Sequence, residues 1–274
     1  MKKQQKENNI KYNFIIGCIL TGMLCLLILL GFVYTPYDPE AMDETQKLAG
    51  ISFSHILGCD NFGRDIFSRI IKGSGTTLMI AAGTVLIGSV IGTIIGAATG
   101  YYGGWLDEIL MRIIDAVFAF PSILLALVFI SLLGPGMVNV IISLGIAFIP
   151  SFARIVRSEF LHCKNMDYVK QARLMGAGNL RIMFLHILPN TLPVLFSSIM
   201  IGFNNAVLAE AGMSYLGIGV QPPDASLGRM LSEAQAYLFT RPSYAFFIGV
   251  FIILMVLGFS LLGEGIKGIR RAGS

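Results

Sequence analysis

The chain has 274 residues, of which 55% are hydrophobic and 13% are charged, and its formal net charge is +4. An ordinary soluble domain carries roughly a quarter charged residues, so the composition excludes a soluble globular protein and indicates a polytopic membrane protein. The basic residues are dispersed without interleaved aromatics, which excludes a nucleic-acid surface, and the four cysteines show neither zinc-site nor disulfide spacing.

Long stretches without Asp, Glu, Lys or Arg predict the membrane spans, because a bilayer core about 30 Å thick requires ~20 apolar residues in a helix. Asp115 intrudes near the start of the third stretch, where we expect it to pair with Arg112 three residues earlier. We expect kinks at Pro121 and Pro150, which lie inside apolar runs. The six predicted spans are 14–34, 76–102, 113–133, 136–153, 187–209 and 242–263.

The distribution of Lys and Arg predicts the orientation of these spans. Fourteen lie on the side of the N-terminus and six on the other side. Cytoplasmic loops carry the excess of positive charge, and an even number of spans places both ends together, so both termini are expected in the cytoplasm of a multi-pass cell-membrane protein. The outer loops are then 35–75 and 213–241, and the largest inward loop is 154–186.

Small residues recur every four positions along the second predicted span. Such spacing lets the backbones of membrane helices approach closely, so this face is either a tightly packed contact or a seam that lines a moving interface or pore. The residues are Thr84, Gly88, Gly92, Gly96 and Gly100.

Enzyme motifs are missing from the sequence. It has no HExxH helix, no GxSxG elbow and no Gly-Lys dipeptide for a phosphate-binding loop. We therefore expect no catalytic residue, no metal site and no directly bound cofactor. Glu210 and Ser214 lie at the outer end of the fifth predicted span, where a carboxylate reaches the interface at low cost. An interfacial or structural role and a role in a gate or substrate pathway both stay open for them.

The inward loop predicts two short helices joined by an elbow. Asp167 is expected to cap a helix that ends at Met175, Gly176 to adopt a left-handed turn, and Asn179 to cap a second helix that runs towards Pro189. A helix of about nine residues is marginal alone and must dock on another surface, either the lipid headgroups or another protein. Its predicted docking face consists of Val169, Ala172 and Met175.

The same loop resembles a known motif. Residues 168–176 (Tyr-Val-Lys-Gln-Ala-Arg-Leu-Met-Gly) and 186–190 (His-Ile-Leu-Pro-Asn) look like the EAA loop of permease subunits of ABC importers. In that family the loop forms a coupling helix that sits in a groove of the ATPase subunit. Lys170 and Gln171 stand where the family has Glu-Ala. The resemblance implies coupling roles for Tyr168, Val169, Ala172, Met175, Gly176 and Pro189.

Other segments resemble the C-type permeases of peptide and nickel importers. Residues 58–65 (Gly-Cys-Asp-Asn-Phe-Gly-Arg-Asp) are similar to the family stretch after the first span, and residues 100–104 and 210–223 resemble other segments of the same family in the same order. The resemblance places the 58–65 loop near the partner permease or the binding protein. Arg64 and Asp65 also fit a plain solvated ion pair. The residues implied in the contact are Asp60, Gly63, Arg64 and Asp65.

The resemblance implies an all-α integral membrane protein with six transmembrane helices and a type I ABC importer permease core. Residues 1–75 would form a cytoplasmic tail, an additional helix and an outer loop, and residues 76–274 a five-helix core with its coupling loop at 157–190. The implied partners in the bilayer complex are a second permease, two ATP-binding cassette ATPases that use the ATP, and an extracytoplasmic substrate-binding protein. The implied substrates are di- or oligopeptides, or nickel, free or chelated. The alternative from the residues alone is a self-contained homo-oligomeric channel or facilitator.

Overall fold

The computed structural model describes the backbone of residues 2–273 and the side chains of residues 12–266. Within this part the chain is helical and contains no strand. A 3₁₀ turn at Glu44–Gln46 lies in the outer loop, and a π-helical segment, Ile182–Ile187, joins α7 to α8. The α-helices are α1 (Lys2–Val33), α2 (Ile66–Tyr102), α3 (Gly104–Phe118), α4 (Ser122–Leu133), α5 (Met137–Cys163), α6 (Asp167–Leu174), α7 (Asn179–Arg181), α8 (Leu188–Tyr215), α9 (Leu227–Gln235) and α10 (Pro242–Gly273).

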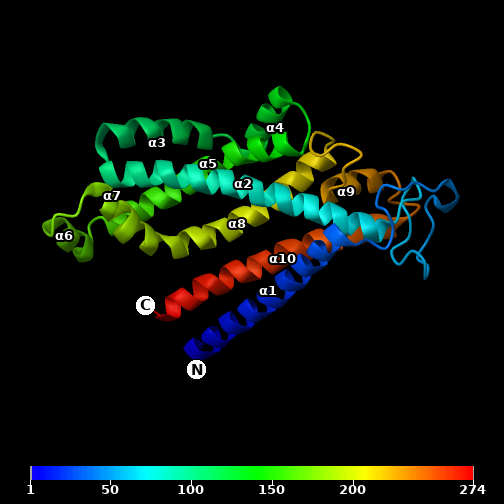
Figure 1. Cartoon of the computed structure of the whole chain (residues 1–274), viewed down its shortest axis with the longest axis horizontal. Coiled ribbons are helices and arrows are strands. Elements are labelled where there is room, and N and C mark those ends of the chain that lie inside the picture. The colour runs from blue at the N-terminus through cyan, green and yellow to red at the C-terminus, as the bar shows by residue number, and fades with distance from the viewer. Residues whose placement is uncertain (1, 274) are drawn as a thin grey trace.

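The long helices run between two ends of the molecule (Figure 1). Helix α2 packs along α5, α8 contacts both of them, and α1 packs along α10 on one side. Helix α6 lies at one end, while α9 and the loop that follows α1 lie at the other end (Figure 1). The predicted division between residues 75 and 76 falls inside α2, so a continuous helix joins the two parts of the chain.

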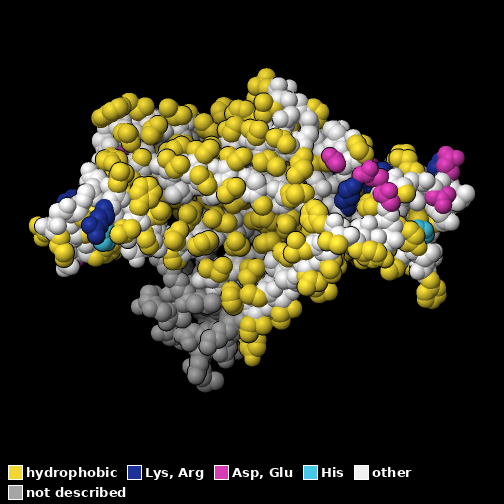
Figure 2. All heavy atoms as spheres, viewed as in Figure 1, with side chains coloured by type: hydrophobic (Ala, Val, Ile, Leu, Met, Phe, Trp, Pro, Cys, Tyr) yellow, Lys and Arg dark blue, Asp and Glu magenta, His cyan; other side chains and the backbone are white. Residues whose placement is uncertain are grey.

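Five helical segments are long and apolar enough to cross a membrane, as five of the six predicted spans required. They are Tyr12–Val33, Ile66–Tyr102, Met137–Cys163, Asn179–Tyr215 and Pro242–Ile266. Hydrophobic side chains cover the middle of the visible face, and charged side chains gather at its two ends (Figure 2). This distribution fits a bilayer around the middle of the helices.

The third predicted span differs from a kinked helix, because α3 and α4 meet at 89°. Pro121 lies between them with an extended ψ of 127°, and its ring disfavours helical geometry for the preceding residue. The helix therefore ends and restarts rather than kinking. Together α3 and α4 still lead from the α6 end towards the opposite end (Figure 1). Helix α5, in contrast, continues through Pro150.

The expected pair between Asp115 and Arg112 is wrong. Arg154 of α5 donates to Asp115 at 2.6 Å, and Arg112 instead pairs with Glu108 one turn away on α3. A second ion pair joins the same two helices, because Arg157 donates to Asp107 through Nε and Nη2 at 2.6 and 2.7 Å. These pairs hold α3 against α5.

The small residues of α2 form a close helix contact with α5. A Cβ atom at Gly92 would lie 2.6 Å from the Cβ of Phe152, and one at Gly96 would lie 2.4 Å from the carbonyl oxygen of Ala153. A Cβ atom at Gly100 would lie 2.8 Å from the carbonyl oxygen of Arg157. The seam is therefore a packed contact, in which only glycine permits this separation of the two backbones.

Substitution of Gly96 by Ala is expected to destabilise the fold, because the added methyl group overlaps backbone atoms of α5. Overpacking of this kind costs about 1–3 kcal/mol. Thermal unfolding of the purified protein in detergent measures the effect as a lower midpoint. Gly249→Ala on α10 is the matched control, since no atom lies within 4 Å of its Cβ position. Equal midpoints for the two variants would contradict the packing argument.

Candidate functional site

A groove opens on one side of the long helices, between α4, α5 and α8. Its volume is about 390 Å³. The helices bring polar and apolar side chains together in it, and among the described residues that line it none is charged. They are Ser122, Ile123, Phe148, Ser151, Phe152, Ile155, Ser198, Ile201, Gly202, Asn205, Leu208 and Ala209.

Four uncharged polar side chains, set among mainly apolar ones, distinguish this groove from a lipid-facing surface. Asn205 is exposed in the isolated chain, and its neighbours in the groove are hydroxyl groups from three different helices. Polar side chains at membrane depth face a cavity or a neighbouring helix rather than lipid. Hydroxyl and amide groups both donate and accept hydrogen bonds without a fixed charge. Sequence patterns missed this site because its residues are separated by up to 87 positions and share no motif.

Helix α6 lies at one end of the helices that form the groove. Val169 and Ala172 are only 1% and 8% exposed, and they pack in a cluster with Tyr101, Phe160 and Ile182. The apolar face of α6 is thus docked on the chain itself. The predicted common docking face is wrong in this respect, because Met175 points away from the cluster and is 83% exposed. Leu174, which sequence reasoning missed, is 88% exposed beside it.

The elbow after α6 confirms one prediction and corrects two. Gly176 has φ +81°, the left-handed geometry expected of it. Asp167 is the first residue of α6 rather than its cap, because Met166 holds that position. Gly178, rather than Asn179, precedes α7, and the Asn179 side chain instead accepts a hydrogen bond from the Tyr101 hydroxyl at 2.8 Å. That bond ties the elbow to the end of α2.

The two remaining residues of the predicted loop lie on either side of this elbow. Pro189 lies in the first turn of α8, a position where a missing N–H is tolerated. Tyr168 is partly exposed on α6 beside Cys163 and Asn190. Burial raises the pKa of the Tyr168 hydroxyl to about 12, so it remains a neutral donor at physiological pH.

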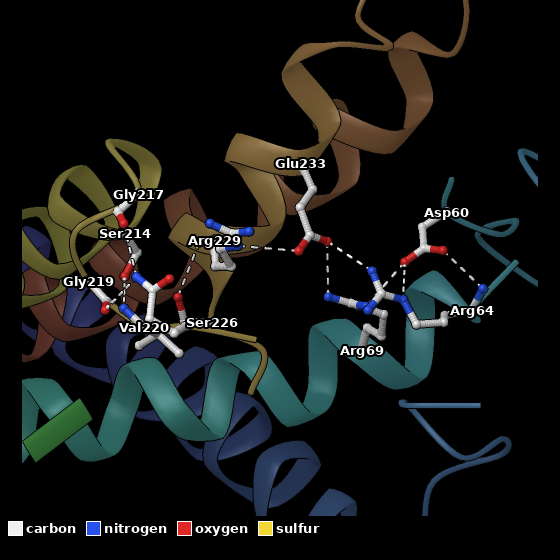
Figure 3. A network of polar contacts seen from close by, with 11 residues as sticks. Asp60, Arg64, Arg69, Ser214, Gly217, Gly219, Val220, Ser226, Arg229 and Glu233 are labelled. Atoms are coloured by element: carbon white, nitrogen blue, oxygen red, sulfur yellow. Dashed lines mark hydrogen bonds and ion pairs between the residues drawn. The ribbon is translucent and has the colours of Figure 1, made fainter. Parts of the chain in front are cut away.

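A buried ion network lies at the opposite end of the molecule (Figure 3). Asp60 pairs with Arg64 at 2.7 Å and with Arg69 at 3.2 Å, and both arginines pair with Glu233 of α9 at 3.1 Å. Arg229 adds a contact to Glu233 at 3.3 Å. The side chains of Arg64 and Arg69 are 6% and 2% exposed. The network therefore clamps the outer loop, α2 and α9 together.

This geometry contradicts the solvated pair of Arg64 with Asp65. Asp65 instead caps α2, accepting from the N–H and hydroxyl of Ser68 at 2.8 and 2.7 Å, and it faces His55 at 2.9 Å. Gly63 has φ +77°, and a Cβ there would lie 1.8 Å from the carbonyl oxygen of Asp43. The four predicted outer residues therefore shape the loop through buried contacts, and their contact with a partner stays a prediction.

Burial raises the pKa of Glu233, although the positive charges of Arg64 and Arg229 oppose this shift. Three arginines hold this carboxylate in the network. A charge in this state depends on all of its partners, because loss of one leaves the other buried and uncompensated.

Glu210 and Ser214 form a separate buried cluster near the outer end of α8. Glu210 is fully buried within the chain, which favours a structural role over exposure at the membrane interface. Its carboxylate accepts hydrogen bonds from Thr77 at 2.9 Å and from Ser214 at 2.7 Å. The Ser214 hydroxyl in turn accepts from the N–H of Val220 at 3.1 Å, as Figure 3 shows. Neither residue lines the groove, and their role in a gate stays a prediction.

Comparison with known proteins shows similarity over most of the chain. Residues 88–269 match the family model of binding-protein-dependent transport system inner membrane components. A glutathione transport system permease protein from Pectobacterium atrosepticum is 44% identical over 88% of this chain and 82% of its own length. A dipeptide transport system permease protein from Alkalihalophilus pseudofirmus is 36% identical over 97% of this chain and 86% of its own length.

A solved structure supports the fold independently. A chain of an inward-facing methionine ABC transporter superposes with a TM-score of 0.64 and 21% sequence identity. The match covers 76% of this chain and 98% of that chain. This similarity confirms the all-α architecture expected of a type I importer permease.

Substitution of Arg69 by Ala is expected to destabilise the α9 end of the molecule, because Asp60 and Glu233 would lose a buried positive partner. Breaking one partner of a buried pair costs about 3–5 kcal/mol. The midpoint of thermal unfolding in detergent measures this loss. Lys72→Ala is the matched control on the same helix, since its pair with Glu40 is exposed and worth about 0–1 kcal/mol. Similar effects of the two variants would contradict the role of the buried network.

Proposed function

Because the chain belongs to the family of binding-protein-dependent transport system inner membrane components, we propose that it is the permease subunit of an ATP-driven importer of short peptides. Members of this family are membrane permeases rather than enzymes. The family membership favours this function over a self-contained channel. The finer points of the proposal concern the pathway, the source of energy, the orientation and the substrate.

The observation that carries the proposal is the connection between the groove and α6. Helices α5 and α8 form two walls of the groove, and α6 lies between them in the chain. Residues 164–166 join α6 directly to α5, whereas residues 175–178, α7 and the π-helical segment join it to α8. A force applied to α6 is therefore transmitted to both walls. Such rigid-body movement of packed helices is a common means of switching access to a site.

The groove forms one side of a pathway, and a second permease completes it. The groove is open, and its exposed Asn205 would be unfavourable against lipid. We therefore place a homologous subunit opposite α4, α5 and α8. The hydroxyl and amide groups among the apolar lining side chains suit a zwitterionic solute that passes without being held by fixed charges.

Energy for transport would come from two attached ATPase subunits, because the chain has no phosphate-binding loop. The exposed Leu174 and Met175 beside the elbow provide an apolar contact for one of them. ATP-driven closure of the ATPases would displace α6 and switch the groove between outward and inward access. This chain itself binds no cofactor in the proposal.

The α6 end faces the cytoplasm in this proposal. The chain enters α1 and leaves α10 on that side, consistent with the excess of Lys and Arg there (Figure 1). The outer end, held by the Asp60 network, then receives the substrate-binding protein. A rigid outer surface favours docking, because little conformational entropy is lost when it binds.

Peptides are the preferred substrate class over nickel. The two relatives described above are named for dipeptide and glutathione transport, and both compounds are short peptides. Each carries amine and carboxylate groups together with amide groups that hydrogen-bond to a neutral polar lining.

Substitution of Asn205 by Leu is expected to lower peptide uptake by about tenfold, because it removes the amide and fills part of the groove. The measurement is ATP-dependent uptake of a radiolabelled dipeptide and of glutathione by proteoliposomes that contain the complex purified from its native membrane. The recovery of a second permease and of ATPase subunits is quantified in the same preparation and is expected to be unchanged.

The matched control is Ser131→Leu, since Ser131 is exposed on α4 but lies outside the groove. Uptake by this variant should equal that of the wild type. Flux without ATP, in a preparation that contains this chain alone, would favour the homo-oligomeric channel. Equal uptake by Asn205→Leu and wild type would remove the groove from the pathway.

Gly176→Pro is expected to uncouple ATP hydrolysis from uptake. Proline fixes φ near −65°, whereas the elbow needs +81°, so the turn that aims α6 is lost. Gly178→Pro is the matched control, because Gly178 already has φ −70°. ATP hydrolysis and dipeptide uptake are measured together in proteoliposomes. Normal uptake by Gly176→Pro would exclude a coupling role for the elbow.

A further inference from the structure

The exposed face of α6 is defined by the residues opposite its buried face. Successive residues of an α-helix are rotated by about 100°, so positions i, i+3, i+4 and i+7 share one side. Val169 and Ala172 lie on the buried side. Asp167 and Lys170 have side chains that are 88% and 63% exposed, and Leu174 is 88% exposed. The opposite face, here called the outward face, consists of Asp167, Lys170, Gln171 and Leu174.

The outward face is oriented away from the membrane. The cluster that receives Val169 and Ala172 is built from the ends of α2 and α5 and from the π-helical segment, which all continue into the spans. The side opposite this cluster therefore points towards water, at the extreme end of the molecule (Figure 1). A helix bound to lipid headgroups would turn its apolar face towards the bilayer, but here the chain itself already occupies that face.

The charge of this end is positive. Lys170, Arg173 and Arg181 oppose the single carboxylate of Asp167 between residues 167 and 181. Lys170 pairs with Asp167 at 3.0 Å, but both groups are exposed, and such a pair is weak enough to be exchanged for a new partner. Arg173 and Arg181 form no ion pair within residues 12–266. The surface around Leu174 is thus an apolar point with a positive rim.

We propose that Lys170 and Leu174 select the ATPase partner of this permease, which receives them in a groove with an apolar floor and an acidic side chain opposite Lys170. This inference rests on the proposed function. Lys170 stands where the EAA motif has an acidic residue, so a groove suited to that acid repels this chain. Attraction to one partner and repulsion of others together produce specificity.

Lys170→Glu tests the charge. The tagged permease carrying this change is purified from its native membrane in mild detergent, and retained ATPase subunits are quantified against the second permease by mass spectrometry. Reversal of an interfacial charge is expected to lower ATPase retention by about tenfold or more, and increasing salt should release the wild-type ATPase in a graded way. A zero-length carbodiimide cross-link, which joins an amine to a carboxylate with loss of water, should connect Lys170 to an Asp or Glu of the ATPase.

The matched control is Arg112→Glu, an equal change of charge at an exposed residue of α3, which should retain the ATPase fully. A second variant, in which the cross-linked acid of the ATPase is replaced by Lys, should restore retention by Lys170→Glu. Full retention of the ATPase by Lys170→Glu would overturn the inference and leave the proposed function intact. No ATPase on the wild type would overturn both. If Lys170→Glu impaired uptake in phosphatidylglycerol vesicles but not in phosphatidylcholine vesicles, the inference would be overturned in favour of an interaction with lipid headgroups.

Discussion

The close contact between α2 and α5 fixes the geometry on which the other features depend. Side chains on this face of α2 are excluded from the contact, since a Cβ at Gly92 or Gly96 would collide with α5. Phe152 lies directly at the contact, and the same side chain lines the groove and approaches Gly202 of α8. One aromatic ring thus links the packed seam to the groove walls. Through two ion pairs, α5 also fixes α3, which places the break before α4.

The two ends of these helices use charge in opposite ways. At the α9 end, the charges of the network around Asp60 and Glu233 are buried and share several partners, so the loop, α2 and α9 form a single rigid unit. At the α6 end the ion pair is exposed and the large apolar side chains are uncovered. An exposed pair holds its partners weakly and exchanges them readily. In the proposed function, the end that would receive substrate is therefore rigid, while the α6 end, which would receive the force, has exposed side chains that can adapt to a partner.

Features encoded locally in the sequence were predictable, and those set by distant partners were not. Hydropathy located the spans because lipid exposure requires long apolar runs, and Gly176 was recognisable because a glycine after a short helix signals a left-handed turn. The partners of Arg64 were missed, since Glu233 lies 169 residues away. Burial of Glu210 was missed for the same reason, because Thr77 approaches it from another helix. The groove combines three helices, and no local pattern marks its members.

In the proposed function, the division of α6 into two faces would allow a helix of eight residues to transmit force. Such a helix is only marginally stable alone, so it must be packed against the rest of the chain before it can bear a force. Val169 and Ala172 supply the anchor within the chain, and the bond between Tyr101 and Asn179 adds α2 to the same assembly. The outward face then does not need to stabilise the helix, so its side chains can determine which partner binds. Unfolding of the loop would expose the buried face of α6, so under the proposed function a displacement of α6 would pass into α5 and α8. The buried contacts on one side of α6 would thus allow a force on its outward face to move the groove walls.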